Sequence, residues 1–197
     1  MENSNKFPQD IPLKSVWESF GIFVLIGFLM IVIFYGGNRI EYIRSLWKID
    51  GLLDQVFSGC IIGILFAVIV VFLYKMKWIQ LPKNEYTELI IQILKKRYGI
   101  VTIALGAGLS EEILFRGAML GVLVSYFSPV FSLVIVSAIF MALHIPQYKG
   151  SVLIHVIIFI MGLGLGGLFL WTEALWAPIT AHAVYNGFLS LLMKKNE

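Results

Sequence analysis

The amino-acid sequence predicts an all-α fold, a polytopic membrane helix bundle of about six transmembrane helices with a core of four helices in its C-terminal half. Two observations predict this fold class. Of the 197 residues, 59% are hydrophobic and only 14% are charged, whereas a soluble domain carries about 25% charged residues. Apolar stretches of roughly 20 residues, long enough to cross a bilayer as helices, also recur along the chain between polar or proline- and glycine-containing segments.

The N-terminal half contains two of these stretches. They run from Phe20 to Gly37 and from Gln55 to Tyr74, with a polar loop at residues 38–54 and a basic connector at residues 75–97. Within the connector, residues 84–97 have the pattern of an amphipathic helix, with four apolar residues on one side and three basic residues at its end: Leu89, Ile90, Ile93, Leu94, Lys95, Lys96 and Arg97. This helix is expected either in the membrane interface, where its basic end would meet anionic headgroups, or as an ordinary helical linker.

The C-terminal half contains four further stretches, at residues 100–126, 129–145, 151–171 and 178–193. In the third of them, Gly162 and Gly166 have the spacing of small residues that lets a neighbouring helix approach closely. We therefore divide the chain into an N-terminal part, residues 1–99, with two helices and the connector, and a C-terminal membrane core, residues 100–197.

The basic residues of the predicted loops are distributed unevenly between the two sides of the membrane. Six helices place both termini on one side, which carries eleven basic residues, while the opposite side carries three. The eleven are Lys6, Lys14, Lys75, Lys77, Lys83, Lys95, Lys96, Arg97, Lys149, Lys194 and Lys195, and the three are Arg39, Arg44 and Lys48. The positive-inside rule then predicts a multi-pass protein of the cell membrane with both termini in the cytoplasm. The expected partner is the lipid bilayer, and no nucleic-acid partner is expected.

A cluster of charged residues interrupts the third predicted span. Charged side chains inside a membrane are costly, which makes them functional candidates. Residues four apart lie on nearly the same face of a helix, so Glu112 and Arg116 can pair, whereas Glu111 points about 100° away and lacks a partner in its own helix. An ion network that only supports packing would explain Glu112 and Arg116, but it leaves Glu111 unpaired.

All three histidines also lie in the C-terminal half. His144 follows Phe140 by four residues at the end of the fourth span, and alone it is typical of an interfacial residue. His182 and Asn186, four apart in the last span, can address one group together or can serve as hydrogen-bonding contacts between helices. His155 has no partner at helical spacing and is interpreted as structural.

Together these features resemble the CPBP family of intramembrane proteases (Abi-like), which includes type II CAAX prenyl endopeptidases and bacteriocin-processing enzymes. The family pattern of Glu-Glu-x-x-x-Arg, Phe-x-x-x-His and His-x-x-x-Asn or -Asp is present without departures, in residues 111–116, 140–144 and 182–186. The resemblance covers residues 100–193, and it implies a four-helix catalytic core that hydrolyses peptide bonds of membrane-associated substrates.

The resemblance also implies a role for each motif residue. Glu111 and His144 would bind and deprotonate the attacking water, and His182 and Asn186 would donate hydrogen bonds to the tetrahedral intermediate. Glu112, Arg116 and Phe140 would support this site. The implied substrate is a peptide or protein at the membrane, with CAAX-type and leader-peptide processing both open.

The use of a metal is left open by the residues. Cys60 is the single cysteine, which excludes disulfides and cysteine-based metal sites. Glu111, His144 and His182 could hold a catalytic zinc ion, but the sequence lacks a His-Glu-x-x-His helix. We expect a site without a cofactor, with zinc as the alternative.

Two other classes of function remain open. One is a non-catalytic bacteriocin-immunity or scaffolding protein of the same fold, which would have no need for Glu111. The other is a small proton-coupled transporter, because acidic residues and histidines also form proton relays. Inverted repeats would favour a transporter, and the sequence shows none.

Overall fold

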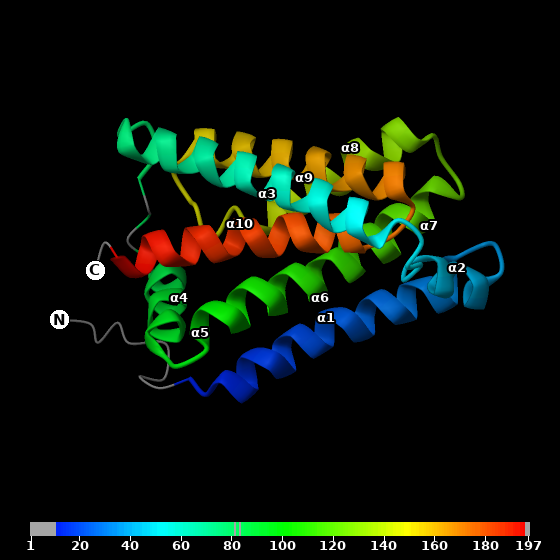
Figure 1. The fold of residues 1–197 in the computed structure, drawn as a ribbon, viewed down its shortest axis with the longest axis horizontal. Coiled ribbons are helices and arrows are strands. Elements are labelled where there is room, and N and C mark those ends of the chain that lie inside the picture. The colour runs from blue at the N-terminus through cyan, green and yellow to red at the C-terminus, as the bar shows by residue number, and fades with distance from the viewer. Residues whose placement is uncertain (1–10, 81, 83, 196–197) are drawn as a thin grey trace.

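The structure, a computed structural model, describes residues 11–80, 82 and 84–195, and every regular element in these residues is a helix (Figure 1). In chain order the helices are α1 (Leu13–Phe34), α2 (Arg39–Ser45), α3 (Leu52–Lys75), α4 (Glu85–Lys95), α5 (Gly99–Val101), η1 (Thr102–Ala107), α6 (Gly108–Glu112), η2 (Ile113–Leu120), α7 (Gly121–Val124), α8 (Pro129–Leu143), α9 (Val152–Thr172) and α10 (Trp176–Lys195). The predicted all-α fold class is confirmed.

Each of the six predicted membrane helices corresponds to a helical segment of the structure. Among the described residues, α1, α3 and α9 are long and apolar enough to cross a membrane on their own. Helix α8 has 15 residues, and α10 has 20 residues but a more polar sequence. For these two helices and for residues 99–124, a membrane crossing stays a prediction.

The third predicted helix is not a regular α-helix. It runs from residue 99 to residue 124, but two π-helical segments, η1 and η2, lie on either side of the five-residue helix α6. Local π-helical geometry is frequent at functional sites because it changes the direction of the following side chains. The short α6 carries both Glu111 and Glu112.

Glycines allow the helices to pack closely around this segment. A Cβ atom at Gly59 of α3 would lie 2.5 Å from the carbonyl oxygen of Ala177 in α10, and one at Gly63 would lie 2.5 Å from that of Ala181. A Cβ atom at Gly162 of α9 would lie 2.9 Å from the Cβ atom of Ser137 in α8. The close approach of helices predicted at Gly162 is therefore confirmed.

The predicted polar loop at residues 38–54 contains the short helix α2. Asn38 accepts hydrogen bonds from the N–H groups of Ile40 and Glu41 and so caps this helix. The phenol of Tyr42 donates to the carbonyl oxygen of Gly117 in η2, at 2.5 Å. The loop is therefore an ordered support for one end of the helix that carries the glutamates.

At the other end of the bundle, α4 lies beside the end of α10 and packs against α5 (Figure 1). The predicted amphipathic helix is present, and Ile93 and Leu94 on its apolar side are buried against the bundle. Asn84 caps α4 by accepting from the N–H of Thr87, and its side-chain amide donates to the carbonyl oxygen of Gln147 at 2.7 Å. The predicted position of α4 in the membrane interface stays a prediction, and Lys6 and Lys83 lie outside the described residues.

Candidate active site

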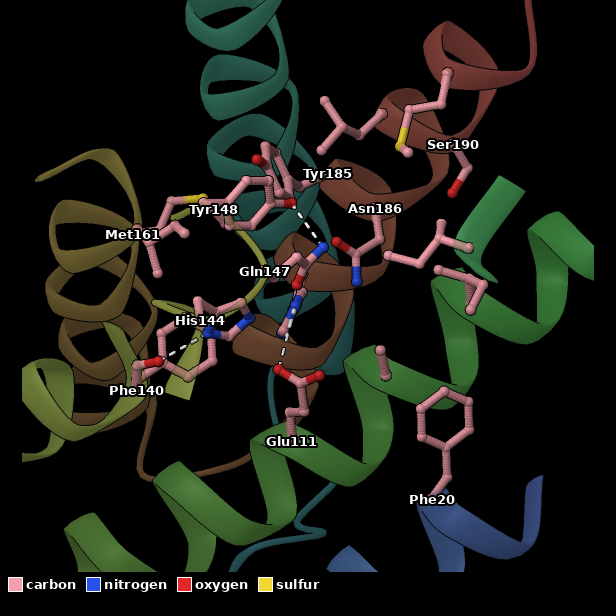
Figure 2. A pocket seen from close by; sticks show the side chains of 17 residues that line it. Phe20, Glu111, Phe140, His144, Gln147, Tyr148, Met161, Tyr185, Asn186 and Ser190 are labelled. Atoms are coloured by element: carbon pink, nitrogen blue, oxygen red, sulfur yellow. Dashed lines mark hydrogen bonds and ion pairs between the residues drawn. The ribbon is translucent and has the colours of Figure 1, made fainter. Parts of the chain in front are cut away.

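A cavity of about 210 Å³ lies between α6, the end of α8 and α10 (Figure 2). Its lining includes Glu111 from α6, His144 directly after α8, and His182 and Asn186 from α10. The structure therefore brings the four predicted site residues together, although Glu111 and Asn186 lie far apart in the sequence. Ile90 of α4 also lines the cavity, so the cavity extends toward the end of the bundle where α4 lies.

Glu112 is fully buried beside this cavity and binds two partners. Its Oε1 atom accepts a hydrogen bond from Nη1 of Arg116 at 2.9 Å, which is the pairing that the spacing of four predicts. The same oxygen atom accepts from Nδ1 of His182 at 2.7 Å. Glu112 thus connects Arg116 on its own helix to a histidine of α10, and this second contact was not predicted from the sequence.

Arg116 is buried and contacts the two helices α8 and α9. Its Nη2 atom donates to the carbonyl oxygen of Gly162 at 3.2 Å, and its guanidinium carbon lies 4.6 Å from the centre of the Phe140 ring. The Phe140 ring in turn lies 4.7 Å from the ring of His144 and 6.1 Å from that of His182. Phe140 therefore contacts Arg116 of the buried ion pair and the rings of both histidines, in agreement with a supporting position.

The hydrogen bonds of the two histidines determine which ring nitrogen is available. Nδ1 of His144 lies 2.8 Å from the carbonyl oxygen of Phe140, which can only accept, so Nδ1 carries the proton and Nε2 is free to accept. Nδ1 of His182 faces the Glu112 carboxylate in the same way. The atom of His182 that remains for another group is Nε2, which lies 4.0 Å from Oε2 of Glu111.

Glu111 differs from its neighbour in being partly accessible. Its side chain is 16% exposed and lines the cavity, whereas Glu112 is 0% exposed. Within the described part of the chain, Oε2 of Glu111 has no hydrogen-bond partner. The Oε2 atom of Glu112 is buried without a hydrogen-bond partner as well, so the partial exposure of the Glu111 side chain distinguishes the two residues. A partly exposed carboxylate at a cavity can bind a water molecule or a substrate group.

The cavity contains polar residues that the motifs did not predict, namely Gln147, Tyr148, Tyr185 and Ser190. Gln147 and Tyr148 lie in the connector after Pro146, and the amide of Gln147 donates to the Tyr148 hydroxyl at 3.0 Å. Burial, together with the negative charge of Glu111, raises the pKa of Tyr148 to about 12, so its phenol stays protonated at neutral pH. Ser190 follows Asn186 by four residues, a spacing that could have identified it.

The use of a metal stays a prediction. No group of three or more His, Cys, Asp or Glu side chains in this part of the chain is placed to hold a metal ion. The possible ligand set of Glu111, His144 and His182 shares the cavity but does not meet at one point. His155 does not line the cavity, and within the described residues its buried Nε2 atom has no hydrogen-bond partner.

The fold and the site define an all-α membrane protein with a buried ion pair next to a cavity lined by a glutamate and two histidines. The family model "type II CAAX prenyl endopeptidase Rce1-like" matches residues 94–188, a region that contains every motif residue from Glu111 to Asn186. The match supports, for this region, the resemblance to the CPBP family of intramembrane proteases that the motifs indicate. No curated protein and no solved structure matches the chain.

Proposed function

We propose that this protein is an intramembrane endopeptidase that hydrolyses a peptide bond of a membrane-associated peptide or protein. The observation that carries the proposal is the convergence of Glu111, His144, His182 and Asn186 on one cavity inside the region that matches a protease family. The proposal covers both CAAX-type processing and leader-peptide processing.

In the proposed reaction, Glu111 and Nε2 of His144 bind one water molecule. Glu111 takes a proton from the water molecule while the oxygen of that water molecule attacks the carbonyl carbon of the scissile bond. The carbonyl oxygen becomes an oxyanion, and the amide nitrogen leaves with the proton returned by Glu111. The partial accessibility of Glu111 and the hydrogen bond from His144 to Phe140 support this division of roles.

The oxyanion is held by His182 and Asn186. Because Nδ1 of His182 donates to Glu112, the atom that faces the oxyanion is Nε2, and it donates only when both ring nitrogens carry a proton. Glu112 therefore orients His182, in addition to pairing with Arg116.

We further propose that the reaction uses no metal and that the protein resides in the cell membrane with both termini in the cytoplasm. In the described residues, Glu111, His144 and His182 do not form a ligand group for a metal, which supports the first point. The basic residues near the ends of α3, α4 and α10 support the second.

The test is cleavage by the protein purified in detergent, with a farnesylated CAAX peptide and a peptide with a double-glycine leader as probes. Glu111→Gln removes the base but keeps the shape, so it is expected to lower kcat by about 10²- to 10⁴-fold. Ser132→Ala, which removes a buried hydroxyl outside the cavity, is the matched control and should cleave normally. Cleavage should also persist after extensive chelation.

The absence of Glu111-dependent cleavage with both probes would contradict the protease proposal. It would favour the alternative function, a non-catalytic immunity or scaffolding protein of the same fold. Loss of cleavage on chelation, restored by zinc alone, would retain the protease but contradict the metal-free reaction.

A further inference from the structure

Helix α10 presents a row of three polar residues to the cavity. His182, Asn186 and Ser190 are spaced by four residues, and all three line the cavity. Four residues advance an α-helix by about 6 Å along its axis. Two of these residues belong to the family motif, and Ser190 continues the row by one further turn toward the end of the bundle where α4 lies (Figures 1 and 2).

Ser190 is buried and has no partner. Its residue is 3% exposed, and among the described residues no group forms a hydrogen bond with its hydroxyl. Serine and threonine in helices commonly donate to the carbonyl oxygen four residues earlier. Ser110, Ser125 and Thr172 do so here, whereas Ser190 does not donate to Asn186. The hydroxyl oxygen of Ser190 is not one of the fully buried unpaired atoms, so it is accessible from the cavity that the residue lines and can bind a water molecule or a substrate group there.

The carboxamide of Asn186 has the same property. It lines the cavity, and the described part of the chain provides it with no hydrogen-bond partner. Two adjacent polar groups on one helix face are therefore available to a single ligand. Ser137, whose buried hydroxyl also has no partner among the described residues, faces the close contact of α8 with Gly162 and not the cavity.

The spacing of this row matches the backbone of an extended peptide. Two residues of an extended strand span about 6.8 Å, close to the advance of about 6 Å between Asn186 and Ser190. With the scissile carbonyl at Asn186, Ser190 lies opposite the peptide group two residues away. A hydroxyl can donate to a carbonyl oxygen or accept from an N–H group, so it can bind a backbone irrespective of sequence.

We propose that Ser190 is a substrate-binding residue that holds the backbone of an extended polypeptide two residues from the scissile bond. The substrate then lies along α10 and extends from the reaction centre toward the end of the bundle where α4 lies. This inference rests on the proposed protease function and adds the conformation and the position of its substrate.

The first experiment compares the kinetics of Ser190→Ala with those of the wild type on an internally quenched peptide that the wild type cleaves in a Glu111-dependent manner. Loss of one neutral hydrogen bond made in both the bound and the transition state should raise KM by about 3- to 10-fold and leave kcat nearly unchanged. Ser190→Thr keeps the hydroxyl and should restore KM. Ser132→Ala, which loses a buried hydroxyl of α8 outside the cavity, should leave KM unchanged.

The second experiment replaces the backbone amides of that peptide by esters, one at a time. An ester lacks the N–H donor, and its carbonyl is a weaker acceptor. The wild type and Ser190→Thr should lose affinity for the peptide with the ester two residues from the scissile bond, and Ser190→Ala should be insensitive to this ester alone.

The outcomes separate the two proposals. Equal sensitivity of the wild type and Ser190→Ala at every ester position would overturn the role of Ser190 while leaving the protease intact. An increase of KM in Ser190→Ala that Ser190→Thr does not restore would reduce Ser190 to a packing residue. If no peptide is cleaved in a Glu111-dependent manner, the protease function fails, and the substrate role of Ser190 fails with it.

Discussion

The carboxylate of Glu112 accepts hydrogen bonds from Arg116 and His182, whereas the carboxylate of Glu111 faces the cavity. The two residues are adjacent, so a helical rotation of about 100° separates their environments. A buried carboxylate with two cationic or proton-donating partners supports structure and orientation, while a partly exposed one can exchange a proton with a substrate water. The two glutamates should therefore differ in what their loss affects.

Glu112→Ala is expected to destabilise the protein by about 3–5 kcal/mol, because it leaves the buried charge of Arg116 without a partner. Adding Arg116→Ala should restore part of the thermal stability. It should not restore cleavage, since His182 still lacks the acceptor for its Nδ1 proton. Melting curves in detergent beside a cleavage assay measure both effects, with Glu111→Gln as the control that should melt like the wild type. A fully stable Glu112→Gln that is inactive, beside an active Glu111→Gln, would reverse the two roles.

Asn186→Ala is expected to lower kcat on the order of 10²-fold while substrate binding persists, because it removes one donor to the oxyanion. A role as a contact between helices is not supported, since its carboxamide has no hydrogen-bond partner among the described residues and lines the cavity. Steady-state kinetics on a cleaved peptide measure the effect. Normal turnover by a folded Asn186→Ala protein would exclude the proposed role.

At the scale of the helices, α3 has a role that its apolar sequence does not reveal. It packs along α10, where Gly59 and Gly63 permit contact with the backbone at Ala177 and Ala181. Ala181 directly precedes His182. The contact between the two helices therefore supports the segment that carries both the histidine and Asn186, from the first half of the chain.

Gly63→Ala is expected to cost about 1–3 kcal/mol, because its Cβ atom would lie 2.5 Å from the carbonyl oxygen of Ala181 and would force α3 away from α10. Cleavage should fall with stability, since His182 would shift. Gly21→Ala in α1 is the matched control: nothing lies within 4 Å of its Cβ position, so it should be neutral or slightly stabilising. Equal melting temperatures for the two variants would contradict a close contact between α3 and α10 at Gly63.

At the scale of the whole molecule, the start of α1 and the end of α10 lie at the same end of the bundle, together with α4 and the nearer part of the cavity (Figure 1). Lys75, Lys95, Lys194 and Lys195 lie in the last turns of the helices that end there. If this end faces the cytoplasm, as the positive-inside rule predicts, the cavity receives its substrate from the cytoplasmic side.

Reporter fusions at residue 197 test this orientation. A cytoplasmic reporter such as β-galactosidase should be active there, and alkaline phosphatase should be inactive. A second fusion in the loop at residues 46–51, between α2 and α3, should give the opposite pattern. Active alkaline phosphatase at residue 197 would place the cavity on the other side of the membrane.

The sequence by itself determined the features that depend on composition and on short spacings. These are the all-α class, the positions of the helices, the pairing of Glu112 with Arg116 and the four motif residues at the cavity. Such features are local, because hydrophobic length determines a helix and a spacing of four determines a shared face.

Only the tertiary structure decided which distant side chains meet. The contact between Glu112 and His182 joins residues 70 positions apart, and the places of Tyr148 and Ser190 in the cavity depend on how α8, α9 and α10 pack. The π-helical segments that interrupt the third helix also depend on tertiary packing, since the apolar pattern of residues 100–126 predicts one continuous helix. Packing of this kind depends on the fit of many side chains and glycine contacts at once, and no spacing along the chain records it.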